Sequence, residues 1–378
     1  MTSSDASPPP VAANPAANRA DLSSVDPSAP MRLGFPVKVL ARPDLKSNDT
    51  RRHKNAPHLK VSLEYLDAIL DHCAKRSIRM YRMSSDLAPY ATHPDMPQFH
   101  GMVAESDADL RAIGDKARAL DIRLSFHPSQ FVLINAPDRT IVAKSVNDLA
   151  SQADMLDRMR LGPEAVLVTH VGGVYDDREA AKRRWVENWH ALPERVRARL
   201  VLENDDLRFS VADTLWIHER TGVRLIFDHQ HHWCFNPEGL GVTEAFGRVL
   251  DTWPSEAEGG ARPKMHFSSP RTEMREITRK DRKTGKPVTT LQEPIWTGHA
   301  DFVQPFEFIR FVRDCAHLIE RRPFDVMLEA KMKDTALERL RRDLPRYAPD
   351  VATLFGPVEP ETTMERPSSP ALTNCSAA

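Results

Sequence analysis

The sequence of 378 residues has little of what marks a disulfide-rich, thiolate-metal or membrane protein. Its four cysteines are scattered without a Cys-x-x-Cys pair, which argues against a thiolate zinc site and against a disulfide framework. No run approaches the roughly 18 consecutive apolar residues of a membrane span, and the first residues do not resemble a secretory signal. We therefore expect a cytoplasmic protein with no membrane attachment.

The sequence also lacks a glycine-rich nucleotide-binding fingerprint. Gly172 and Gly173 follow a predicted strand, but no helix-opening G-x-G-x-x-G surrounds them, so they predict a tight turn and not a phosphate cradle. No nucleotide cofactor is expected. The net charge of −1 neither predicts nor excludes a polyanionic partner, because the distribution of charge over the surface decides that question.

Compositional boundaries enclose one candidate domain. Residues 1–30 are dominated by Ala, Ser, Pro and Asp, and residues 351–378 are rich in Pro, Thr, Ser and Glu. Neither stretch carries enough apolar surface to order itself, so we expect disordered tails at both ends. Residues 31–350 are expected to form a single folded domain.

One pattern repeats within this domain: a short apolar run is followed by a longer helical pattern. The predicted strands, buried on both faces, are Arg32–Val39, Ile78–Met83, Ile122–Phe126, Ala165–Thr169, Leu200–Leu202, Arg224–Phe227, Lys264–Phe267 and Asp325–Leu328. The predicted helices are Leu63–Lys75, Asp107–Leu120, Ile141–Met159, Arg178–Leu192, Val211–Thr221, Val242–Trp253, Pro305–Ile319 and Lys331–Leu344. Eight strand–helix pairs favour an α/β fold of the (β/α)8 TIM-barrel type over a doubly wound sheet.

In such a barrel, catalytic residues lie where the strands end, at the C-terminal face. Six consecutive predicted strands end in His, Asp or Glu, namely in His127, His170, Glu203, Asp228, His266 and Glu329. A single residue of this kind is usually an ordinary hydrogen-bonding group. Six together would repel or desolvate one another unless cations neutralised them.

The densest of these strand ends is Leu225–His232, where three apolar residues run directly into a carboxylate and three imidazoles. Alternate residues of a strand point in opposite directions, so His229 shares a side with His231 only if the chain stays extended past Asp228. Imidazole and carboxylate donors suit Mn²⁺, Zn²⁺ or Mg²⁺. Because the donors exceed what one ion needs, we expect a centre of two or three metals that activates water for displacement at phosphorus.

The same residues carry a family resemblance. From about Arg32 to about Leu344 the chain resembles the ultraviolet-damage endonucleases, which are relatives of the endonuclease IV type of abasic-site nuclease. The motifs that carry the resemblance are Arg32–Gly34, Tyr81–Leu87, Leu124–Gln130, Thr169–Tyr175, Leu202–Asp206, Asp228 with His231 and His232, Lys264–Pro270, His299–Asp301 and Met327–Lys331. The resemblance implies a TIM-barrel DNA-repair enzyme that acts on damaged double-stranded DNA as a metal-dependent endodeoxyribonuclease.

Its implied reaction is incision of the backbone 5′ to a photolesion such as a pyrimidine dimer, often with manganese, and we expect a monomer. By position, the implied metal ligands are His127, His170, Glu203, Asp228, His231, His266, His299 and Glu329. The implied catalytic residues are Glu203, His93 and Lys264. His93 would be a ligand or a close neighbour, and Lys264 matches a lysine that is chemically modified in some members. His232 ranks as a partner of a ligand and His229 ranks last.

Lesion recognition is where the chain departs from the family pattern. Gln130 and Phe131 match a Gln-Tyr pair that the family is thought to wedge into the duplex, and a phenyl ring can still stack on bases. Phe35 and Val39 stand where the family usually has Tyr and Asn. These changes leave the ligands intact and bear on which lesions are accepted.

A second departure is the long segment from Arg271 to Trp296, in which seven basic residues face four acidic ones. Placed on the catalytic face, residues such as Arg271 and Lys280 could contact DNA phosphates. The equally weighted alternative is a solvated loop without a partner.

Other functions remain open at this point. A divalent-metal sugar isomerase or epimerase also places Glu, Asp and His at barrel strand ends, although such sites need fewer histidines and no exposed Gln-aromatic pair. An abasic-site endonuclease would use the same metals. A catalytically inactive damage-binding protein is the weakest alternative, because every expected ligand is present.

Overall fold

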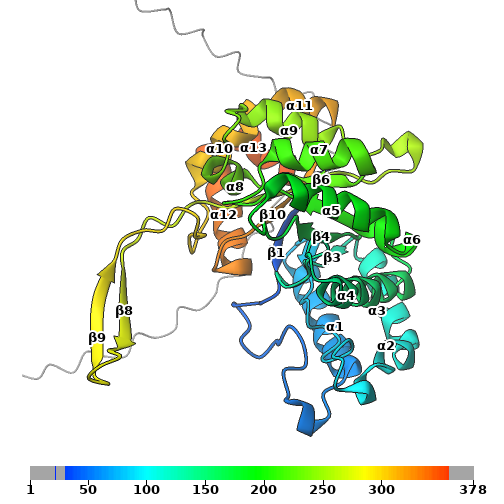
Figure 1. Ribbon diagram of the computed structural model, residues 1–378. Helices are drawn as coiled ribbons and strands as arrows, with labels where there is room; N and C mark the ends of the chain where they lie inside the picture. The colour runs from blue at the N-terminus through cyan, green and yellow to red at the C-terminus, as the bar shows by residue number, and fades with distance from the viewer. Residues whose placement is uncertain (1–21, 23–29, 357–378) are drawn as a thin grey trace, which may run out of the picture.

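Eight short parallel strands form the centre of the computed structural model, which describes residue 22 and residues 30–356 (Figure 1). The strands are β1 (Leu33–Pro36), β2 (Met80–Arg82), β3 (Arg123–Ser125), β4 (Leu167–His170), β5 (Leu200–Glu203), β6 (Arg224–Ile226), β7 (Lys264–Phe267) and β10 (Asp325–Leu328). All eight predicted strands are therefore confirmed. Across the described part of the chain, no helix is both long and apolar enough to span a membrane.

The strands close into a barrel at two seams. One sheet has the order β3-β2-β1-β10-β7 and the other has the order β4-β5-β6. Single parallel bridges join the sheets, between Phe126 and Leu167 on one side and between Asp228 and His266 on the other. The predicted TIM barrel is confirmed, and it is closed by fewer backbone hydrogen bonds at the seams than within each sheet.

The helices surround the strands (Figure 1). Their bounds are α1 (Leu59–Lys75), α2 (Met102–Glu105), α3 (Asp107–Ala119), α4 (Arg139–Arg158), α5 (Arg178–Ala191), α6 (Glu194–Arg199), α7 (Val211–Thr221), α8 (His229–Cys234), α9 (Val242–Leu250), α10 (Pro305–Asp314), α11 (Ala316–Arg321), α12 (Lys333–Tyr347) and α13 (Pro349–Ala352). Short 3-10 turns are His53–Asn55, Pro97–Phe99, Glu256–Glu258 and Thr353–Phe355. The eight predicted helices are present, and the one predicted over Pro305–Ile319 is divided at Cys315 into α10 and α11.

Side-chain capping explains where several helices begin. Ser210 starts α7 with a reciprocal capping box, in which its hydroxyl accepts from the Asp213 N–H and the Asp213 carboxylate accepts from the Ser210 N–H. Asp138 and Asp177 cap α4 and α5 in the simpler way, each accepting one backbone N–H of the first turn. These polar residues are the signals that place the helices after the strands.

Alternation along the strands divides the core into two layers. Leu200 and Leu202 of β5 belong to the large cluster under the helices, whereas Val201 belongs to a small separate cluster enclosed by the strands. The small cluster consists of Val166, Val168, Val201, Ile226, Trp253 and Ala261. Because Glu203 follows Val201 by two residues, it points into the barrel at the carboxyl end of β5. The same spacing takes Val168 to His170 and Ile226 to Asp228.

The predicted boundary between domain and C-terminal tail needs correction. The chain continues past residue 350 through α13 and Thr353–Phe355, and Val351, Leu354 and Phe355 are buried. The Phe355 ring packs 5.6 Å from the ring of Phe308 on α10. Three apolar side chains at helical spacing outweigh the polar composition around them. The rest of that predicted tail, and residues 1–21 and 23–29 of the other, lie outside the described residues, while Leu22 is buried.

The basic segment after β7 is not a loop. It forms an antiparallel hairpin of β8 (Arg275–Lys280) and β9 (Pro287–Gln292), which projects away from the barrel (Figure 1). The β-branched residues Ile277, Thr278, Val288, Thr289 and Thr290 favour strands and were the available sequence signal. The hairpin leaves the barrel from the C-terminal end of β7, which is the face where the strand ends gather.

Candidate metal centre

Glu203 lies at the middle of the cluster at the C-terminal face. Its side chain is fully buried. Its Oε1 accepts from Nδ1 of His266 at 2.8 Å, and its Oε2 lies 3.2 Å from Nε2 of His127 and 3.8 Å from Nε2 of His170. Four strands of both sheets thus direct one carboxylate and three imidazoles toward a common point.

Three overlapping groups of side chains could each hold a metal ion, because their donor atoms lie within 4.8 Å of one another. The groups are His127 with His170 and Glu203, then Glu203 with Asp228 and His231, then Asp228 with His266 and Glu329. They contain seven of the eight ligand residues that the resemblance implies. The eighth, His299, has its Nε2 3.6 Å from Oε2 of Glu329 and so lies beside the third group.

The histidines after β6 lie on a short helix and not on an extended strand. Asp228 begins α8 by accepting the N–H of His231 at 2.7 Å on its Oδ1. The helix turns His229 away from the cluster, so that its ring stacks 4.6 Å from that of Phe267. His231 remains inside, with Nδ1 3.8 Å from Oε1 of Glu203.

His232 contacts no implied ligand side chain among the described residues. Its Nε2 donates to the Leu240 carbonyl at 3.0 Å, and its ring packs 5.3 Å from that of Phe227. The prediction that His232 partners a ligand is therefore wrong. That prediction rested on its position next to His231, and the helix changes the direction of every side chain after Asp228.

Asn204 fixes the backbone that carries Asp228 and His231. Its Oδ1 accepts the Asp228 N–H at 2.9 Å and its Nδ2 donates to the Asp228 carbonyl at 3.1 Å. Its own carbonyl accepts Nδ1–H of His231 at 3.0 Å, so that in the neutral ring the lone pair lies on Nε2. One buried residue therefore sets both the position of the carboxylate and the tautomer of the imidazole.

A similar chain orients His299. Its Nδ1 donates to the Ser268 hydroxyl at 2.8 Å, and that hydroxyl donates to Oε1 of Gln230 at 2.6 Å. In the neutral ring, the Nε2 lone pair would then lie on the side of Glu329. Glu329 in turn pairs with Arg82 and lies 3.3 Å from Nδ1 of His266.

The cluster has too little positive charge to balance its buried carboxylates. Burial disfavours the ionised form of Glu203, but the imidazoles of His266 and His170 hold its pKa well below the usual range. Burial raises the pKa of Asp228, and the nearby carboxylates Glu203 and Glu329 raise it further. Burial alone would lower the pKa of His231, yet the surrounding carboxylates raise it to about 9. A proton on His231 thus occupies the electrostatic role that a cation would take.

Several buried nitrogen and oxygen atoms that could bind a metal have no hydrogen-bond partner in the protein. Within the described residues these include Oδ2 of Asp228, Nε2 of His266 and Nδ1 of His170. A buried polar atom without a partner is destabilising, and the effect is larger for a carboxylate. The unpartnered atoms and the imidazole-carboxylate donor set both fit divalent ions.

Lys264 lies below this cluster, inside the barrel. Its side chain is almost completely buried, and its Nζ lies 3.1 Å from the hydroxyl of Ser125. Burial, together with the positive charges of Arg123 and Arg82, holds the pKa of Lys264 well below its usual range. Burial and these charges therefore disfavour the protonated amine, and only the neutral form is nucleophilic.

His93 does not join any of the three groups. It lines a neighbouring cleft with Asp148 and Ser129, and its Nδ1 accepts the Asp95 N–H at 3.2 Å. Its ring packs at 6.3 Å against Tyr90. Ser129 lines both this cleft and the cavity above the cluster, so His93 lies at the edge of the site and not within it.

Gln130 and Phe131 lie on the rim of a cavity of about 930 Å³ above the cluster. The same cavity is lined by His127, His170, His231, His299 and Glu329. Phe131 is 74% exposed, so its ring is held out to solvent and is free to contact a ligand. The two residues implied in lesion contact and the implied metal ligands therefore open onto one space.

Two of the other residues predicted to contact DNA are buried. Phe35 has no exposed surface and packs 5.4 Å from the ring of Tyr81, because strand alternation turns it into the layer under the helices. Arg271 is 6% exposed, and its backbone N–H bonds the Gly298 carbonyl at 2.8 Å. Direct DNA contact by either residue is thus a wrong prediction. Lys280 is exposed on β8, and Val39 is buried.

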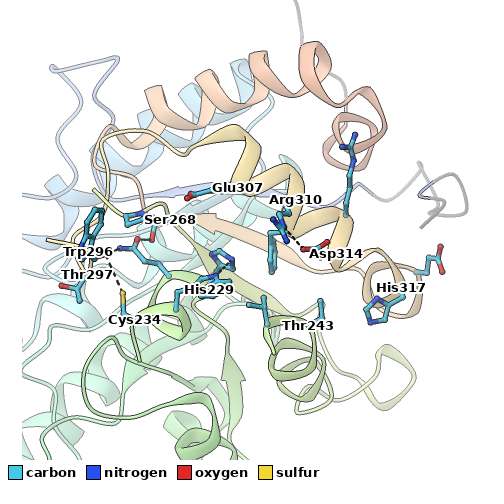
Figure 2. A pocket seen from close by; sticks show the side chains of 17 residues that line it. His229, Cys234, Thr243, Ser268, Trp296, Thr297, Glu307, Arg310, Asp314 and His317 are labelled. Carbon is cyan, nitrogen blue, oxygen red and sulfur yellow. Dashed lines mark hydrogen bonds and ion pairs between the residues drawn. The ribbon is translucent and has the colours of Figure 1, made fainter. Parts of the chain in front are cut away.

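A second, larger cleft of about 1590 Å³ lies beside the centre, between α8 and α10 (Figure 2). Its wall includes Gln230 and Ser268, and the Ser268 hydroxyl holds His299. Trp296, at the base of the hairpin, stands at its edge, and its carbonyl accepts Nε2–H of Gln230 at 2.8 Å. The hairpin base and the His299 side chain are therefore linked through one glutamine.

The residues that orient the ligands were not assigned from the sequence. Asn204 and Arg82 lie within motifs that carry the resemblance, and Ser268 and Gln230 lie next to predicted ligands. A signal was therefore present, but their roles depend on hydrogen bonds between strands that are far apart in the chain.

Comparison with known proteins agrees with this geometry. The family model described as "UV-endonuclease UvdE" matches residues 38–355. A "UV DNA damage endonuclease" of Bacillus pumilus (strain SAFR-032) is 34% identical over 269 residues, covering 71% of this chain and 75% of the relative. One of Bacillus velezensis is 32% identical over 311 residues, covering 82% and 89%.

Among solved structures, SacUVDE superposes with a TM-score of 0.67 at 29% identity, covering 84% of this chain and 98% of that one. Endonuclease IV from Thermus thermophilus has a TM-score of 0.52 at 15% identity, covering 83% and 99%, which shows a shared fold.

Proposed function

Because the chain belongs to the UV-endonuclease UvdE family, we propose that it is a DNA-repair endonuclease that cuts damaged duplex DNA 5′ to ultraviolet photolesions. The observation that carries the proposal is a single cavity with three metal-capable groups at its floor and Gln130 and Phe131 at its rim. A phosphodiester bond next to a distorted base step would meet the donor groups while the damaged bases meet the rim.

We propose two or three divalent ions as cofactors, with Mn²⁺ first and Mg²⁺ or Zn²⁺ as alternatives. The sharing of Glu203 and Asp228 between neighbouring groups supports more than one ion. The ligands would be His127, His170, Glu203, Asp228, His231, His266, His299 and Glu329. When bound, the ions would supply an activated water as nucleophile and neutralise the charge that develops on the phosphate oxygens.

The remaining residues of the centre would position these ligands. Asn204 holds Asp228, Ser268 holds His299, and Arg82 holds Glu329. Lys264 would act from below, where burial disfavours its protonated form, and would be available for chemical modification. His93 would act at the edge of the cavity, through the wall that it shares with Ser129.

Phe131 and Gln130 would recognise the lesion by entering the base stack. An exposed aromatic ring stacks on any base, with about 1–3 kcal/mol per base at stake. Phe131→Ala should therefore weaken productive binding of damaged duplex by roughly 5- to 150-fold, while Phe131→Tyr should stay close to wild type. Equal KM values for Phe131→Ala and wild type would show that Phe131 takes no part in lesion recognition.

The proposal is tested by incision of defined duplexes that each carry one cyclobutane dimer, one 6-4 product or one abasic site. Chelated protein is assayed alone and after addition of Mn²⁺, Mg²⁺ or Zn²⁺. We expect metal-dependent cuts immediately 5′ to the dimer. Cutting of only the abasic duplex would identify an abasic-site endonuclease, and sugar epimerisation without any cutting would identify the isomerase alternative.

Glu203→Ala tests the site assignment within the same assay. Removal of this carboxylate should abolish incision, because two of the three groups lose a donor. Its circular dichroism spectrum should remain that of the wild-type barrel. Incision at the wild-type rate by a folded Glu203→Ala protein would refute the assignment.

A further inference from the structure

We propose that the β8–β9 hairpin is an arm that binds the phosphate backbone of duplex DNA outside the lesion. This inference rests on the proposed function for its substrate and adds a second contact surface to it. The arm is defined as Arg275–Gln292, and it includes both strands and the turn between them.

The arm is strongly basic although the whole chain is nearly neutral. It has six basic residues, Arg275, Arg279, Lys280, Arg282, Lys283 and Lys286, and two acidic ones, Glu276 and Asp281, for a net charge of +4. All six basic residues are exposed. The Asp281 carboxylate is occupied in the turn, where it accepts the N–H groups of Lys283 and Thr284. A polyanion is the partner that such a surface fits.

The two faces of the arm differ. Cross-strand pairing places Arg275, Ile277 and Arg279 on one face, opposite Gln292, Thr290 and Val288. Glu276 and Lys280 lie on the other face, together with the hydrogen-bonded pair Thr278 and Thr289. The first face, which we call the arginine face, carries two positive charges and no negative one. At about 3.4 Å per residue, its arginines are about 14 Å apart along the ribbon.

The arginine face begins at the rim of the metal centre. Arg275 has its Nη2 4.0 Å from Oδ1 of Asp301, which follows His299 by two residues. The backbone N–H of Met332, three residues after Glu329, bonds the Asp301 carbonyl at 2.9 Å. DNA seated over the centre would therefore continue directly onto the arginines.

The base of the arm is fixed to the barrel. Pro270 and His299 form an antiparallel bridge, and the Arg271 N–H bonds the Gly298 carbonyl at 2.8 Å. Gln230 donates to the Trp296 carbonyl at 2.8 Å. Both ends of the insertion are thus held next to a predicted ligand, which gives the arm a direction. Six-residue strands extend about 20 Å, the length of roughly six base pairs.

Protein association is the competing use of such an arm. Its exposed large apolar side chains are Val288 and Leu291, and these lie on opposite faces, so they form no continuous apolar patch. Charge complementarity therefore favours DNA over a second copy of the chain.

The test is binding of the full-length, metal-free protein to undamaged duplex DNA, measured by fluorescence anisotropy over a series of salt concentrations. The variant Arg275→Gln/Arg279→Gln removes both charges of the arginine face. The slope of log K against log salt is negative, and each lost phosphate contact reduces its magnitude by about 0.9 and the affinity at 0.1 M salt by about eightfold. We expect a slope that is less negative by about 1.8 and an affinity lower by roughly 10- to 60-fold.

The matched control is Arg160→Gln/Arg248→Gln. Both arginines are exposed; Arg160 follows the end of α4 and Arg248 lies in the last turn of α9, so both are near the face opposite the centre. The control removes the same charge and should leave slope and affinity unchanged. Equal losses in both variants, or no loss in the first, would overturn the proposal. A change in sedimentation with unchanged DNA affinity would also overturn it and would identify the arm as a contact between copies.

Failure of the proposed function is distinguishable from failure of the arm. Undamaged-duplex binding needs neither metal nor incision, so a protein that binds through the arginine face but cuts nothing refutes the reaction alone. A protein that cuts dimer-containing DNA, and whose arginine-face variant binds like wild type, refutes the arm alone.

Discussion

Single polar side chains decide whether the ligands of the centre point at one another. Asn204 is the clearest case, because it bonds both backbone groups of Asp228. Loss of such an orienting residue typically lowers metal affinity by about 10- to 100-fold. We therefore expect Asn204→Ala to need that much more Mn²⁺ for half-maximal incision, with recovery of activity at saturating metal.

Asn236 provides a matched control for that prediction. It makes the same two-way contact, in this case with the backbone of Leu240, outside the three metal-capable groups. Asn236→Ala should lose comparable stability and keep the wild-type metal requirement. Identical metal titrations for Asn204→Ala and wild type, measured by calorimetry, would show that Asn204 has no orienting role.

At the residue scale, the sequence predicted the metal-ligand residues of the centre but not the residues that orient them. His, Asp and Glu at strand ends follow from strand position alone, so Glu203 and His266 could be selected without a structure. Asn204 could not, because its partner is 24 residues away and is defined by the register of β5 against β6. Phe35 was assigned by its match to a family position, and strand alternation would have assigned it to the core.

Among the elements, the loop before α1 contains a buried carboxylate whose protonation is linked to stability. Asp49 accepts from Arg51 Nη2 at 2.6 Å and from the His58 N–H at 2.9 Å, and its side chain is 3% exposed. The Arg51 guanidinium is the main cause that lowers the pKa of Asp49 from 3.8 to about 2. The folded state therefore gains stability above pH 3.8 and loses it as pH falls toward 2.

Asp49→Asn should cost about 1–3 kcal/mol of unfolding free energy at pH 7, because the charged acceptor is lost. The difference from wild type should shrink below pH 3.8 as the wild-type carboxyl is protonated. Urea unfolding at about pH 7, 5 and 3 measures both effects. Asp44→Asn, which removes an exposed partner of Arg42, is the control and should leave stability close to that of wild type at all three pH values. A pH-independent difference for Asp49→Asn would contradict the linkage.

The elements also show where prediction from the sequence stops. Apolar runs and helical spacing located all eight strand–helix pairs, because each must bury one stripe against the barrel. The hairpin buries almost nothing, so its strands leave no apolar signal and only their β-branched residues indicate them. Helix α8 depends on one capping contact from Asp228, which a cluster of histidines does not reveal.

At the scale of the whole molecule, one end of the barrel carries the metal centre and the other end contributes to stability. The end opposite the metal centre holds a buried ion-pair network around Asp325, the first residue of β10. Its Oδ2 accepts from Arg123 at 2.9 Å, and its Oδ1 accepts the Arg32 N–H at 3.0 Å. Asp325→Ala should lower the unfolding free energy by about 3–5 kcal/mol, since it leaves a buried guanidinium unpaired.

The metal requirement of Asp325→Ala should stay that of wild type under conditions where the protein is folded, because the change lies at the far end of the strands. Asp121→Ala is the control, since that carboxylate is 68% exposed and pairs with Arg32 at the surface. It should cost less than about 1 kcal/mol. Chemical denaturation of the three proteins decides between these expectations.

The two seams of the barrel have a mechanical consequence. His127 and His170 flank the seam at Phe126 and Leu167, and Asp228 and His266 form the other seam themselves. Ions held by these groups would link the two sheets of the barrel at both seams, where the sheets are joined by single bridges. Adding Mg²⁺ should therefore slow backbone hydrogen exchange in residues 164–170 and 262–268 more than in β1 and β2. Mass spectrometry measures this exchange. Equal slowing in all four segments would contradict the prediction. The catalytic chemistry of this barrel and its resistance to opening at the seams would then depend on the same few side chains.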